Sequence, residues 1–392
     1  MKCILMNKNT EVLVAEYKAN LGVFTEIYEI NNIKYAPVIV NETYKHNKDI
    51  IVTISDWFRG RGIPTFRDAL DLLLIRLNVS TPEELLDKAF GLSLSDQYWI
   101  KPFDSKIKYG DINFFEHDFD SADFTEATFS NNINKNTQIS LISPNNTTDG
   151  RLKKTWIIEN NKRYLLKGGF KNEVMQPFNE VLASMICNRL GFQHTNYDIE
   201  VINDKIVSKC ECFINCDTEL VTAYQVLHNL EKNYENKDYE KYIKILEKNG
   251  IENAREKIEN MFILDYIIMN EDRHLNNFGI IRDVNTLKWL DVAPIFDNGQ
   301  SLNIVNYNDD EIIVDGQGRF FYNVDNFENI IKNIDNIKRI DINLLDGIVE
   351  EFDDLLHKYQ YITKMSENRI YKLCVLLNSR INKLKKIIET NN

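Results

Sequence analysis

Residues 269–279 read Met-Asn-Glu-Asp-Arg-His-Leu-Asn-Asn-Phe-Gly, and the interpretation of the whole chain starts from this stretch. An apolar pattern with helical spacing, Met261 to Met269, precedes it, and the short apolar run Ile280-Ile281 follows it. A second acidic site further along the chain, Pro-Ile-Phe-Asp-Asn-Gly at 294–299, supplies another carboxylate at Asp297. The sequence therefore predicts a helix, a polar loop, a strand and a second polar turn.

These polar residues match the needs of phosphoryl transfer. Asp272 could orient an attacking hydroxyl group, while Asn277 and Asp297 could hold one metal ion. Phosphoryl transfer requires a group that orients the nucleophile and oxygen ligands for Mg²⁺ on the phosphates. Asp, Asn and Gly also cluster in ordinary surface turns, and Asn276-Asn277 alone favours that alternative. The apolar elements around the complete set favour the catalytic interpretation.

The stretch resembles the catalytic segment of the HipA-like serine/threonine protein kinases, an atypical branch of the protein-kinase fold. Its Asp-Arg-His loop is also similar to that of phosphatidylinositol 4-kinase-like kinases. The resemblance implies that Asp272 is the catalytic Asp, that Asn277 and Asp297 are Mg²⁺ ligands, and that His274 is a structural residue of the loop. The triplet that begins at Asp297 reads Asp-Asn-Gly, so it lacks the middle aromatic residue of Asp-Phe-Gly.

Composition places the chain among globular proteins. It has 392 residues, 43% hydrophobic and 27% charged, which is enough for two or three domains. The net charge of −12 argues against broad nucleic-acid binding.

No apolar stretch reaches membrane-spanning length and no signal peptide is evident, so we expect a cytoplasmic protein with reduced thiols. Cys210, Cys212 and Cys216 lack a partner cluster with zinc-like spacing, which favours packing over a metal site.

We expect an α+β, bilobal, protein-kinase-like fold with a β-rich N-lobe, a helical C-lobe and an additional N-terminal α+β module. The expected domains are the module at 1–130, the N-lobe at 131–216 and the C-lobe at 217–392. The module begins with short strands up to about residue 54, including Ile51 to Ile54, and Thr81-Pro82-Glu83-Glu84 is a capping box that starts a helix.

The predicted N-lobe offers a nucleotide site. Gln138 to Ile142, Lys154 to Glu159 and Tyr164 to Gly169 read as strands, and the loop 143–151 lies between the first two. By resemblance, this loop covers the ATP phosphates through backbone N–H groups, including that of Gly150. In some HipA-like kinases a loop Ser is autophosphorylated, so Thr147 and Thr148 are candidates for that role. A plain turn is the alternative.

Lys167 stands in the third of these strands, and the resemblance makes it the residue that binds the ATP phosphates. Glu180, at the start of the following helix, would fix it, although a favourable charge at a helix N-terminus explains Glu180 equally well. We expect Asn179 to cap this helix and Gly191 to end it. Glu211 and Phe213 follow a predicted hairpin at the expected hinge, where the backbone would bind adenine.

From about residue 218 the pattern is helical. Asp265 lies on the apolar stripe of the 252–269 helix, and we expect it to brace the following loop, because buried carboxylates need partners. Residues 280–290 read as a hairpin, and 300–324 as an irregular segment where a kinase has its activation segment.

The sequence thus predicts an ATP- and Mg²⁺-dependent kinase for Ser/Thr hydroxyl groups of a protein. The alternatives are a kinase for a small molecule or lipid, and a nucleotide-binding regulatory module without catalysis. HipA-like kinases often work as toxins checked by a small DNA-binding antitoxin. Any such partner would be a separate chain, and we expect no direct contact of this chain with nucleic acid or membrane.

Overall fold

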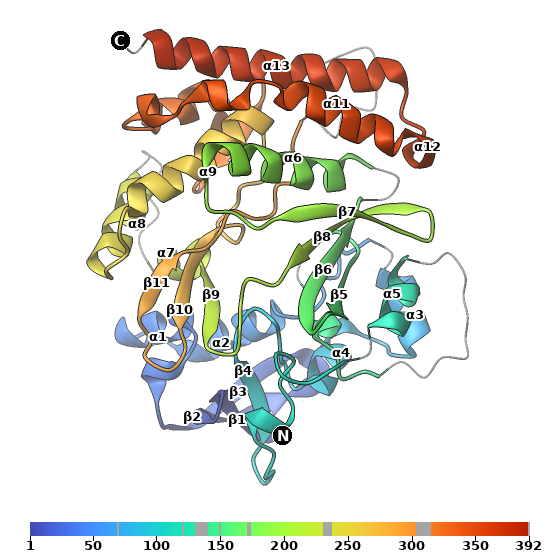
Figure 1. Cartoon of the computed structure of the whole chain (residues 1–392). Coiled ribbons are helices and arrows are strands. Elements are labelled where there is room, and N and C mark those ends of the chain that lie inside the picture. Colours follow the sequence, from blue (N-terminus) through green and yellow to red (C-terminus); the bar gives the residue numbers. More distant parts are fainter. Residues whose placement is uncertain are drawn as a thin grey trace. The chain divides into compact units, whose positions relative to one another are not determined.

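The computed structural model describes residues 1–68, 70–119, 121–129, 140–148, 150–170, 174–229, 237–302 and 315–390, apart from the side chains of residues 76 and 237. The chain divides into two units. Unit 1 comprises Met1–Lys167, Glu211–Leu230 and Ile280–Leu290, and unit 2 comprises Gly168–Cys210, Glu231–Gly279 and Asp291–Asn392. Each unit combines segments that are far apart in the sequence, as the colours of Figure 1 show.

Unit 1 is built on an antiparallel sheet in the order β3-β2-β1-β4. Its strands and the two helices that follow β3 are β1 (Lys2–Asn7), β2 (Thr10–Lys18), β3 (Val23–Ile30), β4 (Tyr98–Pro102), α1 (Val38–Lys45) and α2 (Ile50–Arg59). Cys3 and Leu5 lie in one core cluster with residues of α1 and α2, whereas Ile4 and Met6 lie in another. The two faces of β1 are therefore both buried, which explains its nearly continuous apolar sequence.

The second of these clusters extends beyond the expected N-terminal module. Trp156 and Ile158 of β5 pack against it, together with Cys212.

The remaining elements of unit 1 are α3 (Leu70–Leu77), α4 (Pro82–Lys88), α5 (Ala122–Phe129), β5 (Lys154–Glu159), β6 (Lys162–Gly168), β9 (Thr218–Thr222), α7 (Ala223–Leu227), β10 (Gly279–Asp283) and β11 (Trp289–Val292). Of these, β6, β10 and β11 extend just into unit 2. The expected division into domains at 1–130, 131–216 and 217–392 stays a prediction.

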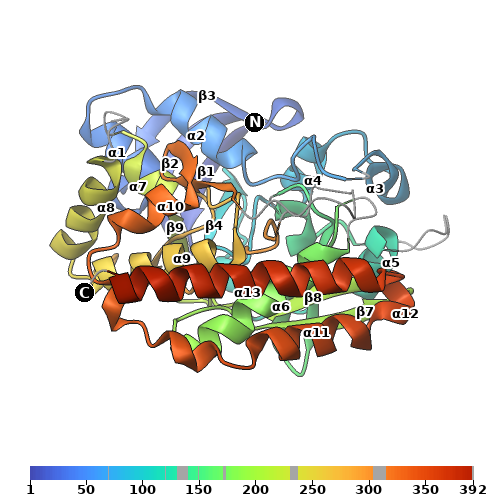
Figure 2. The same ribbon diagram turned by 90° about the horizontal axis from the view of Figure 1, so that it is seen from above.

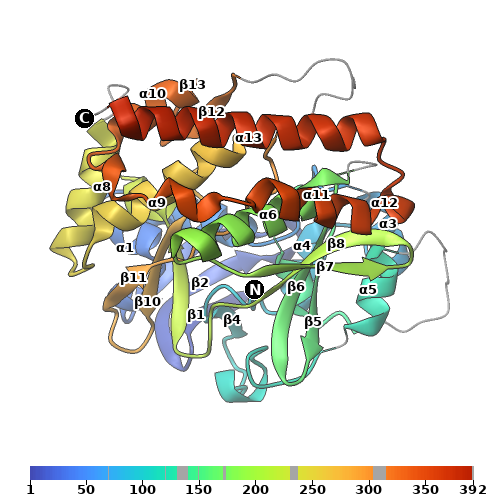
Figure 3. The same cartoon turned by 45° about the horizontal axis from the view of Figure 1, so that its top comes forward.

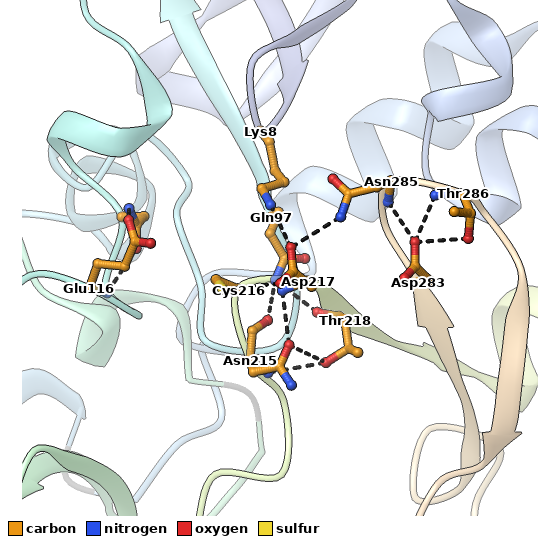
Figure 4. A network of polar contacts seen from close by, with 11 residues as sticks. Lys8, Gln97, Glu116, Asn215, Cys216, Asp217, Thr218, Asp283, Asn285 and Thr286 are labelled. Atoms are coloured by element: carbon orange, nitrogen blue, oxygen red, sulfur yellow. Dashed lines mark hydrogen bonds and ion pairs between the residues drawn. The ribbon is translucent and has the colours of Figure 1, made fainter.

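Polar contacts join three distant segments of unit 1, as Figure 4 shows. Asp217 accepts hydrogen bonds from Lys8 Nζ at 2.9 Å and from Asn285 Nδ2 at 3.0 Å. The bond from Lys8 is the largest of the effects that hold the pKa of Asp217 below its ordinary value. The turn after β1, the segment before β9 and the β10–β11 turn are thereby joined.

A buried charge network joins β4, β9 and β10. Arg282 of β10 pairs with Glu219 of β9 at 2.5 Å and donates a hydrogen bond to the Tyr98 hydroxyl of β4 at 3.0 Å. All three side chains are almost fully buried. Burial raises the pKa of Glu219 and the charge of Arg282 opposes this rise. Loss of either charge would leave the other buried without its partner.

Unit 2 is mainly helical. Its elements are α6 (Met175–Leu190), β7 (Tyr197–Ile202), β8 (Lys205–Glu211), α8 (Lys237–Lys248), α9 (Ala254–Ile268), β12 (Gln317–Phe320), β13 (Asn323–Asn326), α10 (Phe327–Ile330), α11 (Ile348–Lys358), α12 (Gln360–Thr363) and α13 (Glu367–Thr390), of which β8 extends into unit 1 by its last residue, Glu211. Figures 2 and 3 show α13 running alongside α11. The fully buried Arg380 of α13 donates to the Tyr266 carbonyl of α9 at 3.1 Å and lies over the Tyr266 ring.

Several predicted elements have other forms in the structure. Ile51–Ile54 belongs to helix α2, not to a strand, because Ile50, Ile54 and Phe58 share one buried face and Asp49 caps the helix. Residues 140–142 are not a strand, and the rest of that predicted strand lies outside the described residues. Strand β9 was not predicted, and the segment predicted to be irregular contains the β12–β13 hairpin.

Other predictions are confirmed. The Thr81 hydroxyl accepts the Glu84 N–H at the start of α4, and Gly191 ends α6 in a left-handed conformation. The hairpins of β5–β6 and β7–β8 form as expected, with Asn160-Asn161 and Asn203-Asp204 at their turns. None of the helices in the described part of the chain combines the length and the apolar character needed to cross a membrane.

Candidate active site

The candidate catalytic loop begins where α9 ends. Met269 adopts a left-handed conformation, with φ of 52°, and its N–H caps the helix by donating to the Asp265 carbonyl. Asn270 then donates from its side-chain Nδ2 to Asp265 Oδ1 at 2.9 Å. The prediction that Asp265 braces the following loop is therefore confirmed.

Arg273 is the centre of the loop. Its side chain has 0% exposure and forms a two-point ion pair with Asp265, with Nε–Oδ2 and Nη2–Oδ1 distances of 2.9 and 2.8 Å. Burial disfavours the charge of Arg273, but the Asp265 carboxylate more than offsets it, and the pKa of Arg273 is raised. A planar guanidinium suits this geometry, because it can satisfy several acceptors at fixed angles.

The other donors of Arg273 reach the second acidic site. Its guanidinium donates to the carbonyl groups of Asn277 at 3.0 Å and Phe296 at 2.6 Å, and to Asn298 Oδ1 at 2.6 Å. One buried side chain thus fixes the end of the catalytic loop and the turn around Asp297. The polar Asn298, which replaces an aromatic residue of the kinase pattern, is an acceptor in this network.

The backbone of Asp272 is also fixed within the loop. Its N–H donates to Asn270 Oδ1 at 3.1 Å, and its carbonyl accepts the side-chain Nδ2 of Asn277 at 2.9 Å. The Asp272 carboxylate is 42% exposed and is therefore accessible from solvent. Partial desolvation and the neighbouring charge of Asp272 raise the pKa of Glu271.

Helix α6 holds the turn around Asp297 from another direction. Glu180 Oε2 accepts the Asn298 N–H at 2.8 Å, and Asn179 Nδ2 donates to the carbonyls of Gly299 at 2.9 Å and Ser301 at 2.7 Å. Asn179 is fully buried inside α6, which begins four residues earlier at Met175. The prediction that Asn179 caps the helix is therefore wrong, and its side chain binds the turn instead.

The residues present fit a Mg²⁺ ion. The bond from Asn277 Nδ2 to Asp272 uses the amide nitrogen, which leaves the amide oxygen as the atom available to a metal. Together with the Asp297 carboxylate it would provide hard oxygen ligands of the kind that Mg²⁺ prefers. No group of three His, Cys, Asp or Glu side chains suited to a metal occurs among the described residues.

His274 makes local contacts. Its Nδ1 accepts the Asn276 N–H at 3.2 Å, its carbonyl accepts the Asn277 N–H at 2.8 Å, and its Nε2 lies 3.9 Å from Asp272 Oδ2. The ring is 39% exposed. These contacts agree with a structural role, although Arg273 makes many more connections.

The residues that we expect to bind the nucleotide belong to unit 1, except for Glu180, which belongs to unit 2. Lys167 is buried near the end of β6, opposite Lys154 in the β5–β6 register. Glu211 is the last residue of β8 and forms an exposed ion pair with Lys162 at 2.8 Å, and Phe213 follows it, half-buried. Because Lys167 and Glu180 belong to different units, their pairing stays a prediction.

The predicted phosphate loop contains a short 3₁₀ helix, Pro144–Thr147. The Thr147 hydroxyl donates to the Leu92 carbonyl at 2.7 Å, and the Thr148 hydroxyl donates to the Asn145 carbonyl at 3.1 Å and accepts from Arg67 at 2.8 Å. Both threonines are buried. Gly150 has φ of 94°, a conformation that favours glycine, and its carbonyl also binds Arg67.

Sequence reasoning overlooked two connections. Arg273 belongs to the stretch 269–279, and the need of a buried Asp265 for a partner could have identified it in the loop that follows the helix. The role of Asn179 had no local signal, because its acceptors lie in a distant part of the sequence, at Gly299 and Ser301.

The helices and antiparallel sheets of this chain form a kinase-like α+β fold, with the candidate loop and the turn around Asp297 joined by Arg273. The chain belongs to the HipA-like family, because the family described as HipA-like C-terminal domain matches residues 145–340, half of the chain. The predicted family and fold class are thereby confirmed.

Individual relatives are distant. The serine/threonine-protein kinase CtkA of Helicobacter pylori is 25% identical over 221 residues, which are 54% of this chain and 63% of CtkA. The chain therefore spans less than two thirds of that relative. A chain of the Shewanella oneidensis MR-1 complex of HipA, HipB and operator DNA is 12% identical, with a TM-score of 0.54 over 98% of this chain and 97% of that one. The crystal structure of CtkA gives a TM-score of 0.47 at 22% identity, over 61% of this chain and 90% of CtkA.

Proposed function

We propose that the protein is an ATP- and Mg²⁺-dependent kinase that transfers the γ-phosphate to Ser or Thr hydroxyl groups of a protein. The observation that carries this proposal is the Arg273 network, which fixes the loop of Asp272 and Asn277 and the turn of Asp297 in one unit. An arrangement that places an orienting carboxylate beside hard oxygen ligands suits phosphoryl transfer.

In this proposal each residue has one role. Asp272 orients the acceptor hydroxyl and takes its proton, while Asn277 and Asp297 hold Mg²⁺. A Mg²⁺ ion held by these two residues would supply charge neutralisation for the phosphate groups. Lys167 and the 143–151 loop, with Gly150, bind the phosphates, and Glu180 fixes Lys167. The backbone around Glu211 and Phe213 binds adenine.

Thr147 and Thr148 remain proposed autophosphorylation sites. Because both hydroxyls are buried and hydrogen-bonded, modification would require residues 144–148 to leave their present position. A cytoplasmic location and a separate small antitoxin partner are also proposed, in line with HipA-like toxins. Purification of the tagged protein from its native host, followed by mass spectrometry of bound proteins, tests for this partner.

The first experiment measures label transfer from γ-labelled ATP with Mg²⁺ to the protein itself and to dephosphorylated casein. Wild type is compared with Asp272→Asn, Asp297→Asn and the control Asp56→Asn, which alters an exposed carboxylate of α2. We expect transfer by wild type and the control, and loss in both site variants. Tight ATP binding without transfer by wild type would instead indicate a nucleotide-binding regulatory module.

A further inference from the structure

Strand β12 brings an arginine to the candidate catalytic residue. Arg319 Nε lies 3.3 Å from Asp272 Oδ1, and the two side chains are 47% and 42% exposed. The other carboxylate oxygen, Oδ2, faces His274 Nε2 at 3.9 Å, beyond hydrogen-bond distance. The two oxygens of Asp272 therefore have different surroundings.

The strand that carries Arg319 is anchored on its opposite side. In β12, Gly318 and Phe320 are buried whereas Gln317 and Arg319 are exposed, as expected for a strand with one buried face. The Phe320 ring lies 4.8 Å from that of Phe262 on α9, measured between ring centres. This anchoring fixes the backbone of Arg319 relative to α9 and to the loop that follows it.

The β12–β13 hairpin lies close to the candidate catalytic loop. A Cβ atom at Gly318 would lie 3.2 Å from the Asn270 carbonyl oxygen and 2.6 Å from Cε1 of Phe327. The absence of a side chain at 318 thus lets β12 lie against the loop, with Arg319 as the next residue. The backbone position of Arg319 follows from this packing.

The ion pair contributes little to stability. Exposed pairs of this kind typically contribute about 0–1 kcal/mol, because water screens the charges and two side chains lose freedom. The carboxylate of an unrestrained Asp also rotates broadly about χ2. A cation beside one oxygen of Asp272 therefore biases the orientation of this carboxylate while contributing little to folding.

We propose that Arg319 is a positioning residue for phosphoryl transfer, which holds Oδ1 of Asp272 and leaves Oδ2 to receive the acceptor hydroxyl. This inference rests on the proposed kinase function. In the transfer, the acceptor oxygen forms a bond to the γ-phosphorus while the bond from that phosphorus to the β–γ bridging oxygen breaks. ADP leaves with the bond electrons, and the hydroxyl proton passes to Oδ2 and then to solvent.

The test compares Arg319→Gln and Arg319→Lys with wild type and with Arg59→Gln. Arg59 is a matched control, since it is 49% exposed and forms an exposed ion pair with Asp56. Label transfer from γ-labelled ATP to dephosphorylated casein gives kcat and KM. We expect kcat to fall roughly 3- to 5-fold in Arg319→Gln, because a pair that contributes up to about 1 kcal/mol can bias the orientation of Asp272 by about that factor, with KM for ATP and casein within about twofold.

Two further readouts separate positioning from other roles. Arg319→Lys should recover part of the rate, because it keeps the cation without the planar fork. In an Asp272→Asn background, Arg319→Gln should change the residual rate by less than about twofold, since coupled residues give non-additive effects. Thermal unfolding should not distinguish Arg319→Gln from Arg59→Gln.

Defined outcomes overturn the inference. Equal kcat for Arg319→Gln and Arg59→Gln, with active wild type, would show that Arg319 has no role in catalysis. A rise in KM for casein at unchanged kcat would make Arg319 an acceptor-binding residue instead. Absence of transfer by wild type would overturn the proposed function, and this inference with it.

Discussion

Arg273 shows how one residue can determine the geometry of a site. It is a fully buried cation that binds Asp265, two carbonyl groups and Asn298. A buried pair is costly to break, because the remaining charge keeps its desolvation penalty. The site therefore depends on Arg273 for stability as well as for shape.

We expect Arg273→Leu to lower the free energy of unfolding by about 3–5 kcal/mol, because it leaves Asp265 charged and buried. The double variant Asp265→Leu/Arg273→Leu should regain part of that loss, since neither charge remains, but it should not regain kinase activity. Urea unfolding and label transfer measure the two effects. A double variant no more stable than Arg273→Leu alone would contradict this account.

A second prediction concerns Asn179, whose side chain binds the turn around Asp297. In Asn179→Asp a carboxylate would face the carbonyls of Gly299 and Ser301, and two hydrogen bonds from the present amide would be lost. Each buried group without a partner costs about 1–3 kcal/mol, so we expect the turn around Asp297 to move. The Mg²⁺ concentration for half-maximal activity should rise. Asn188→Asp, at an exposed position of the same helix, is the control, and an equal shift in both would refute the role of Asn179.

The sequence predicted Asp265 as a brace because a carboxylate on an apolar helical stripe must find partners. It also brought Asp272, Asn277 and Asp297 into one hypothesis, and the structure places their loop and turn on the same Arg273. Arg319 had no such signal. Its link to Asp272 depends on tertiary packing between residues that are distant in the sequence.

At the level of elements, the β12–β13 hairpin packs against the loop through Gly318. We expect Gly318→Ala to displace it, because the new Cβ would lie 2.6 Å from the Phe327 ring. Overpacking of this kind costs about 1–3 kcal/mol. Transfer activity should fall together with the thermal midpoint, whereas Gly110→Ala, where nothing lies within 4 Å, should change neither. Unchanged activity in Gly318→Ala would show that the hairpin position is unimportant.

The start of α13 is held to α11 by a pH-dependent contact. His357 Nε2 lies 3.0 Å from Glu367 Oε2, and its Nδ1 lies 3.2 Å from Asp353 Oδ2. The hydrogen bond with Glu367 is the main cause that raises the pKa of His357 above its ordinary 6.5, and Gln360 and His357 lower the pKa of Glu367. A raised histidine pKa stabilises the folded state below the unfolded value, and this stabilisation is lost as the pH rises through the folded value.

We therefore expect His357→Gln to unfold at a lower temperature than wild type near pH 6, and at the same temperature near pH 8.5. The pH dependence follows from the histidine charge, because Glu367 stays ionised at both values. Differential scanning calorimetry at the two pH values measures the difference. A constant difference across pH would mean that shape, not charge, decides the contribution of His357.

Element prediction succeeded where local signals were strong and failed where packing decided. The turns at Asn160-Asn161 and Asn203-Asp204 specify hairpins through residues that tolerate positive φ. Ile51–Ile54 is apolar enough for a strand, and only its burial against the sheet of unit 1 shows the helical period. Strand β9 is short and depends on pairing with β10, which the local sequence does not indicate.

At the scale of the whole molecule, the first sheet of unit 1 packs against strand β5, which the sequence did not suggest. Ile4, Met6 and Val14 of the first sheet share a core with Trp156 and Ile158 of β5. The Arg282–Glu219–Tyr98 network adds buried polar links between β4, β9 and β10. The sheet β3-β2-β1-β4 therefore stabilises strands that the proposed kinase function requires.

We expect a fragment that begins at residue 131 to lack a stable unit 1. It would expose the apolar side chains of β5 that now pack on the first sheet, and it would leave Arg282 and Glu219 without the Tyr98 hydroxyl. Exposed apolar surface and weakened packing predict dye binding and a broad, non-cooperative thermal transition. Fluorescence with a hydrophobic dye and calorimetry of the fragment beside the full chain provide the measurement. A fragment that unfolds cooperatively at the full chain's midpoint would show that the N-terminal residues are a separable module, and the shared core would then contribute little to kinase stability.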